Sequence, residues 1–163
     1  MKRKILIEPY EEEFAAVNYY VIRFKDEEDS EFDKFFEKFD GDESFAESFN
    51  IIIEWLNTIG DEGGLNDHLR NEGGSLKAIP IVTSKLRLYC FKVNECIIIL
   101  GNGGHKPKHV KAYQDDPELN KYVSELAIAV ASKVMDQTMN NEINNNLVNK
   151  YIKEIEKKEV KIN

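Results

Sequence analysis

The sequence predicts an α+β domain: an antiparallel sheet with two helices before its central strands and one helix after them. Two patterns support this class. Short runs of β-branched and aromatic residues, which favour strands, flank a stretch whose apolar residues recur at helical spacing. A chain of 163 residues with 42% hydrophobic content can bury one core. We therefore expect one domain over residues 1–138, with the helices packed to one side of the sheet, and a tail over residues 139–163.

The first half of the chain is expected to hold two strands, at residues 3–8 and 19–24, followed by two helices. Ser30 and Asp33 have the spacing of a helix start, and phenylalanines at positions 32, 35, 36 and 39 then form one helical stripe. Ser44 and Glu47 show capping-box spacing and begin a second apolar helix that ends at Gly60. Both apolar stripes are typical of core packing.

The second half is expected to contain a helical turn and then three strands, which span residues 76–79, 86–93 and 96–100. The last two strands form a hairpin. With a two-residue turn, Val93 faces Cys96 and Cys90 faces Ile99. The two thiols then point to opposite sides of the sheet and cannot bond, so we expect both cysteines to be reduced core residues. In the same register, one face of the hairpin carries Arg87, Tyr89, Phe91, Ile98, Leu100 and Asn102.

The last helix is expected to start at Asp116 and Pro117, where the carboxylate caps the helix and proline occupies its first position. The tail differs in composition, with six asparagines between Asn140 and Asn149. Its apolar residues recur every four positions, which favours a helix that docks on the body or forms a homodimer with a second copy. Asparagine disfavours helix interiors, so a loosely ordered tail is the other interpretation.

Charge is unevenly distributed along the chain. The formal net charge is −8, yet the segment from His68 to Tyr113 holds eight lysines and arginines, all three histidines, and only Glu72 and Glu95 as opposing charges. We call this segment the basic island. A local positive field attracts phosphate even on an acidic molecule, so the island predicts an anionic ligand.

Other classes of protein are disfavoured. No apolar run approaches the roughly 20 residues needed to span a bilayer. The basic start, with three apolar residues before an acid and a proline, is too short for a signal-peptide core, so we expect a cytoplasmic protein. The spacings of phosphate-binding and dinucleotide-binding glycine motifs are absent, and no residue pattern completes a metal site, so we expect no cofactor and no metal.

Two features of the island could carry chemistry. Arg87 lies in an otherwise apolar strand, where a guanidinium needs either an anionic ligand in a cleft or a structural ion pair with a carboxylate. After the next strand, residues 101–109 form a glycine-rich and then basic segment, GNGGHKPKH. Glycines allow backbone N–H groups to approach a phosphate closely, although an ordinary flexible turn has the same composition.

The pattern LRLYCFKVNECIIILGNGGHKPK resembles the RelE/ParE superfamily of toxins from bacterial toxin–antitoxin pairs, and the HigB-like branch most closely. The resemblance covers roughly residues 30–135. It implies a RelE-like fold and a toxin that cleaves messenger RNA without a metal, usually on the ribosome. In such endoribonucleases the ribose 2′-hydroxyl attacks the adjacent phosphate while cationic side chains stabilise the developing charge. An antitoxin of the helix-turn-helix type is the implied partner.

The resemblance also implies roles for individual residues. Arg87 matches the strand arginine that stabilises the phosphate, and Lys106 and Lys108 match the basic pair after the last strand. By proximity alone, His105 or His109 could act as acid or base, and Tyr113 could stack a base or donate a proton. The remaining basic residues of the island are expected to bind RNA: Arg70, Lys77, Lys85, Lys92 and Lys111.

A non-enzymatic binding module of the same fold is the alternative. Members of the family are small and basic, whereas this chain is longer and acidic, and Gly103 and Gly104 replace the usual phenylalanine before the basic pair. Acidic surroundings reduce non-specific RNA affinity, which depends on phosphate neutralisation. In this interpretation the basic island holds a partner protein.

Overall fold

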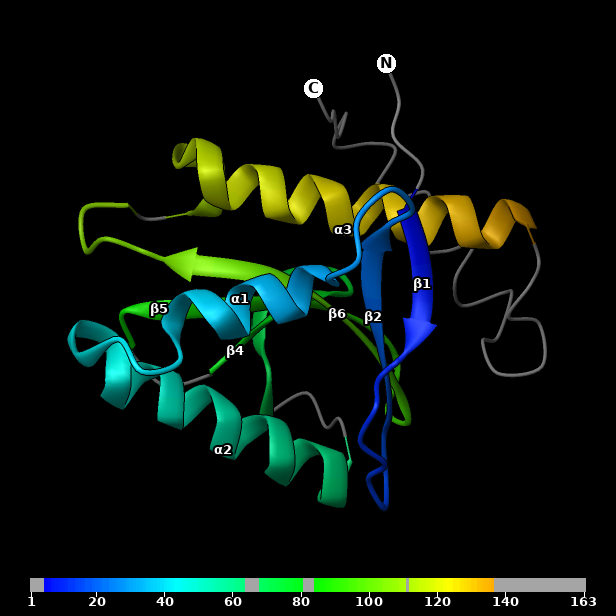
Figure 1. The fold of residues 1–163 in the computed structure, drawn as a ribbon, viewed down its shortest axis with the longest axis horizontal. Coiled ribbons are helices and arrows are strands. Elements are labelled where there is room, and N and C mark those ends of the chain that lie inside the picture. Colours follow the sequence, from blue (N-terminus) through cyan, green and yellow to red (C-terminus); the bar gives the residue numbers. More distant parts are fainter. Residues whose placement is uncertain (1–4, 64–67, 81–83, 111, 137–163) are drawn as a thin grey trace.

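The protein forms one mixed sheet with helices on both faces (Figure 1). The structure is a computed structural model and describes residues 5–63, 68–80, 84–110 and 112–136, so the predicted tail and Lys111 lie outside the described residues. The strands are β1 (Ile5–Pro9), β2 (Asn18–Phe24), β3 (Arg70–Gly73), β4 (Leu76–Ile79), β5 (Leu86–Asn94) and β6 (Ile97–His105). The helices are α1 (Glu31–Phe39), α2 (Ala46–Glu62) and α3 (Pro117–Asp136), with short 3-10 turns η1 (Glu43–Phe45) and η3 (Tyr113–Asp115). None of these described helices is long and apolar enough to cross a membrane.

The six strands lie in the order β1-β2-β6-β5-β4-β3. Neighbours pair antiparallel except β2 and β6, which pair in parallel from Asn18 and Ile97 to Val21 and Leu100. The prediction of an antiparallel sheet was therefore wrong at this one pair. The two paired strands are separated in sequence by both helices and three other strands, and a local residue pattern carries no information about such a distant partner.

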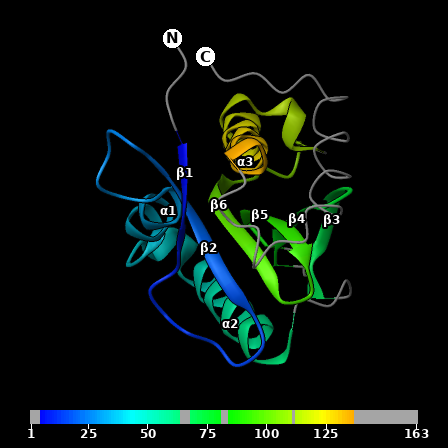
Figure 2. The same ribbon diagram turned by 90° about the vertical axis from the view of Figure 1, so that its right-hand side faces the viewer.

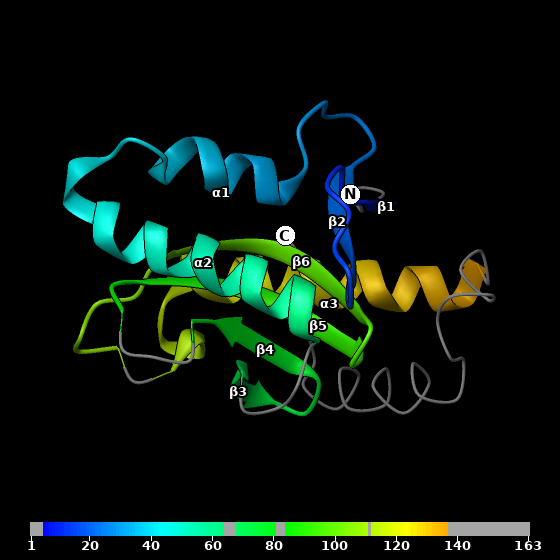
Figure 3. The ribbon, with the colours of Figure 1, turned by 90° about the horizontal axis from the view of Figure 1, so that it is seen from below.

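The helices cover both faces of the sheet, and the prediction that they pack to one side was wrong. Figures 2 and 3 show α1 and α2 on one face and α3 on the other. Each face has its own buried core; Phe35, Ile52 and Leu88 belong to one, and Tyr89, Phe91 and Leu126 to the other. Since β5 is buried on both faces over nearly its whole length, each face requires a covering layer.

Two of the predicted helix starts are confirmed. Ser30 caps α1: its Oγ accepts a hydrogen bond from the Asp33 N–H at 3.0 Å, and the Asp33 carboxylate accepts one from the Ser30 N–H at 3.1 Å. Asp116 precedes α3, and its Oδ1 accepts hydrogen bonds from the N–H groups of Glu118 at 3.0 Å and Leu119 at 3.1 Å. These side chains satisfy N–H groups that a helix start leaves without partners.

The predicted capping box of Ser44 and Glu47 was wrong. The α2 helix begins at Ala46 without a side-chain cap, and η1 precedes it. Asp42 caps this turn, because its Oδ1 accepts a hydrogen bond from the Ser44 N–H at 3.0 Å. Asp42, two residues before Ser44, therefore acts as the cap in place of the Ser44 side chain.

The hairpin register also differs from the prediction. Cys90 pairs with Leu100 instead of Ile99, and a bulge between Leu88 and Cys90 shifts the pairing again. Residues 101–105 continue β6 rather than forming a loop, and Gly104 faces Arg87 across the hairpin. Tyr89 and Phe91 share the α3 face with Arg87 as predicted. Ile98, Leu100 and Asn102 do not, because they point toward α1 and α2.

Both cysteines are free thiols, as predicted. Cys90 is buried in the core between the sheet and α2, and burial raises the pKa of its thiol to about 12. Cys96 is exposed at the hairpin turn, so the prediction of a core position was wrong for this cysteine. Neither thiol belongs to a redox pair within the described part of the chain.

Replacing Gly103 with alanine should destabilise the fold by roughly 1–3 kcal/mol. A Cβ at this position would overlap the backbone carbonyl oxygen of Arg87, so β5 and β6 would have to separate. Urea unfolding of Gly103→Ala measures the loss. Gly104→Ala is the matched control, since its Cβ would lie 3.4 Å from the flexible side chain of Leu119. Equal stability of the two variants would contradict this account.

Candidate functional site

Arg87 is the centre of the candidate site, on the face of β5 that α3 covers. The residue is only 5% exposed, and its Nη1 donates hydrogen bonds to the carbonyl oxygens of Ser84 at 2.7 Å and Leu86 at 2.9 Å. Its Nε is buried and has no hydrogen-bond partner among the described residues. A buried donor without an acceptor costs free energy, and the described residues supply no acceptor for this Nε.

Further charges surround Arg87. Burial lowers the pKa of the Arg87 guanidinium, and the positive charge of Arg70 on β3 lowers it further, while Glu72 opposes both. Glu72 is half-buried; burial raises its pKa, and the charges of Arg70, Lys106 and Arg87 lower it. Three cations from three separate segments therefore act on one carboxyl group. Arg70, Arg87, Lys106 and this Glu72 carboxyl form what we call the Arg87 site.

Two tyrosines close the Arg87 site on the side of α3. The ring centroids of Tyr89, on β5, and Tyr113, in η3, lie 5.9 Å apart in an edge-on arrangement. Burial raises the pKa of both phenols, and the negative charge of Glu72 adds to the shift in each. Both hydroxyls therefore stay protonated at neutral pH and can donate hydrogen bonds to an anion.

The convergence of Arg87 with the segment from Lys106 to Lys108 stays a prediction; the charges of Arg87 and Lys106 both act on Glu72, and other predicted residues lie elsewhere. His105 points to the opposite face of the sheet, where the centroids of its ring and the Phe45 ring lie 5.3 Å apart. Lys77 and Lys92 lie on that same opposite face, because they alternate with residues of the α3 face. The remaining predicted residues are at the surface: Lys85, Lys108 and His109.

Two members of the Arg87 site were not proposed from the sequence. Glu72 was noted only as an opposing charge, because residues 65–70 were expected to form a helical turn and β3 was not recognised. Tyr89 was placed on the correct face but given no role. Glu72 is an acid within the basic island and lies two positions after Arg70 in the sequence. On a strand this spacing places both side chains on the same face, and this signal could have identified Glu72.

Comparisons with protein-family models, curated proteins and solved structures find no match for this chain.

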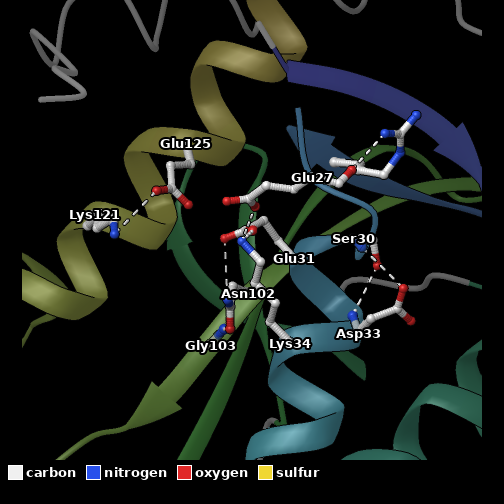
Figure 4. Close-up of polar contacts among 10 residues, drawn as sticks. Glu27, Ser30, Glu31, Asp33, Lys34, Asn102, Gly103, Lys121 and Glu125 are labelled. Atoms are coloured by element: carbon white, nitrogen blue, oxygen red, sulfur yellow. Dashed lines mark hydrogen bonds and ion pairs between the residues drawn. The ribbon is translucent and has the colours of Figure 1, made fainter. Parts of the chain in front are cut away.

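A second buried polar cluster lies away from the Arg87 site, where α1 and α3 approach each other beside β6. Figure 4 shows Glu31 of α1 and Glu125 of α3 pointing toward one another near Asn102 of β6. The two glutamates are 3% and 2% exposed. Burial raises the pKa of the Glu125 carboxyl, and the neighbouring Glu31 carboxyl raises it further, so Glu125 keeps its proton at neutral pH.

The surroundings of this carboxyl pair hold it in place. Lys34 forms ion pairs with Glu27 and with Glu31, the latter at 2.6 Å, and Asn102 Nδ2 donates a hydrogen bond to Glu31 Oε1 at 3.3 Å. Lys121 lies 3.9 Å from Glu125. The pair thus joins helices from opposite faces of the sheet, and we assign it a structural role.

Glu125→Gln should make the stability of the fold less dependent on pH. The native carboxyl retains its proton up to about pH 8, whereas the ordinary value is 4.5. Between these values the folded state binds more protons than the unfolded chain, so wild-type stability falls as pH rises across this window. Glutamine removes that contribution. Urea unfolding from pH 4.5 to 8 measures the difference.

The exposed-acid variant Glu54→Gln is the control for this measurement, and it should retain the wild-type pH profile. A Glu125→Gln protein whose stability falls with pH as steeply as the wild type would contradict a protonated Glu125 in the folded state.

Proposed function

We propose that this protein is a RelE/ParE-like toxin that cleaves messenger RNA at the Arg87 site. The observation that carries the proposal is the buried Arg87 guanidinium. Its Nε has no acceptor among the residues that the structure describes, and the charges of Arg87, Arg70 and Lys106 act on the same Glu72 carboxyl group. A phosphodiester oxygen supplies the missing acceptor and the negative charge that these cations favour. The residues that carry the family resemblance, in β5 and at the end of β6, supply two of the three cations.

The arrangement supports a chemical route in which each charge has a role. The ribose 2′-hydroxyl attacks the adjacent phosphorus and gives its proton to the Glu72 carboxylate, whose raised pKa makes it a better base near neutrality. Arg87 and Arg70 stabilise the charge that develops on the phosphoryl oxygens. The bond from phosphorus to the 5′ oxygen then breaks, and the ammonium of Lys106 protonates that oxygen. The products are a 2′,3′-cyclic phosphate and a free 5′-hydroxyl.

The tyrosines supply hydrogen bonds in this route rather than proton transfer. Because burial raises the pKa of Tyr89 and of Tyr113, neither phenol ionises easily enough to act as a base. Their hydroxyls and rings can instead orient the phosphate and an adjacent nucleobase. An antitoxin partner and action on the ribosome belong to the same proposal.

The alternative function is a non-enzymatic module that holds a partner protein through the same surface. One observation favours it: His105 lies on the face of the sheet opposite Arg87, so the nearest histidine of the predicted set cannot take part in proton transfer there. In that case the Arg87 site binds a carboxylate or phosphate of the partner and breaks no bond.

Arg87→Ala should abolish toxicity and RNA cleavage. We expect that expressing the wild type without a partner arrests bacterial growth and yields messenger fragments with cyclic phosphate or 3′-phosphate ends. Removing a charge that stabilises the transition state should slow cleavage by about 100-fold or more. Growth curves and mapping of fragment ends measure both effects.

Variants that preserve the fold keep this test decisive. Lys106→Ala and Glu72→Gln change less buried side chains and should also slow cleavage, whereas Lys25→Ala removes an exposed charge after β2 and should leave it unchanged. Circular dichroism confirms folding of each variant. Normal growth with intact messenger during high expression of folded wild type would refute the nuclease and favour the binding module.

A further inference from the structure

A groove lies at the edge of the sheet far from the Arg87 site. It has a volume of about 640 Å³ and is lined by the β1–β2 hairpin and the start of α1, which Figure 2 shows side by side. The Arg87 site belongs to β3, β5 and the end of β6, toward the other edge. The groove therefore has no part in the proposed function, and the inference below stands independently of it.

Aromatic rings form one wall of this groove. Tyr10 and Phe32 pack edge-on with ring centroids 5.4 Å apart, and Phe32 lies 6.3 Å from Phe36. Phe36 is 38% exposed and is the large hydrophobic side chain that the described surface leaves open to solvent. Apolar surface in a concave site is the usual floor of a binding groove.

Carboxylates surround the aromatic wall. The fold brings together two acidic stretches of the sequence, residues 8–13 and 26–33, and Glu11, Glu12, Glu28 and Asp33 line the groove. The negative charges of Glu12, Asp33 and Glu11 each add to the effect of burial in raising the pKa of Tyr10, so their fields converge on the aromatic wall.

The positive charge in the groove is already neutralised. Arg23 donates hydrogen bonds from Nε and Nη2 to both carboxylate oxygens of Glu8, at 2.7 and 3.1 Å, and from Nη1 to the Glu27 carbonyl at 2.8 Å. The groove therefore presents an aromatic surface under a negative field, which repels RNA and attracts cationic side chains.

We propose that this groove, which we call the acidic groove, binds a lysine- and arginine-rich segment of a partner protein. The aliphatic stems of such side chains lie against Tyr10, Phe32 and Phe36, and their charged ends meet the ring faces and the surrounding carboxylates. Charge complementarity selects the basic segment, and the exposed Phe36 ring provides the apolar contact. Since the two sites are on opposite edges of the sheet, both can be occupied at once.

The test measures binding of a fluorescently labelled peptide of lysine, arginine and alanine to the full chain by anisotropy. The double variant Glu11→Lys/Glu12→Lys should weaken binding by about tenfold or more, and Phe36→Ala should weaken it several-fold. The matched control is Glu54→Lys/Glu62→Lys, which changes the net charge equally at exposed positions on α2 and should change binding less than about twofold.

Each other outcome overturns the proposal. Equal weakening by both double variants would show attraction to the overall negative charge rather than to the acidic groove. Unchanged binding in Glu11→Lys/Glu12→Lys would place the peptide elsewhere on the molecule. If the basic peptide does not bind measurably to the folded wild type at low salt, the acidic groove is not a binding site for basic segments. If a glutamate-rich peptide binds equally tightly, the groove does not recognise its partner by charge.

Discussion

The burial of the β5–β6 hairpin on both faces is the constraint on which the other elements depend. Residues of this hairpin alternate between two separate cores, so the sheet requires a layer on each side. The chain supplies α1 and α2 before the central strands and α3 after them, and the Glu31–Glu125 carboxyl pair joins the two layers beside β6. The fold is thus closed around one hairpin from both sides.

The same hairpin creates the chemistry of the candidate site. Arg87 occupies a strand position that would suit an apolar residue, and its partner across the hairpin is Gly104, where Leu119 and Tyr122 of α3 pack closely. The guanidinium is therefore desolvated by the core and held by two backbone carbonyls. An interaction between charges is stronger where water is excluded, so the burial of Arg87 would strengthen the phosphate contact in the proposed function.

Local signals in the sequence predicted the elements that depend on local interactions. The caps at Ser30 and Asp116 and the alternation of Arg87, Tyr89 and Phe91 required only nearby residues. The parallel pairing of β2 with β6 and the contact between Glu31 and Glu125 depend on segments far apart in the chain. The face of His105 depends on the bulge at Gly101 and Asn102, and a bulge shifts a register without leaving a distinctive pattern. Glycine was taken as a loop signal, whereas Gly103 is required by the close approach of two strands.

The acidic groove and the Arg87 site lie at opposite edges of one rigid sheet, and this separation makes the molecule electrically polar along the direction of strand order. In the field of a polyanion such as RNA, a molecule of this kind experiences a torque before it makes contact, and the torque turns the β3–β5 edge toward the polymer. Random rotation is otherwise a main reason why association is slower than the collision rate. Under the proposed function, a protein with a net negative charge would therefore approach RNA with the Arg87 site first, because its orientation, rather than its total charge, determines which surface arrives first.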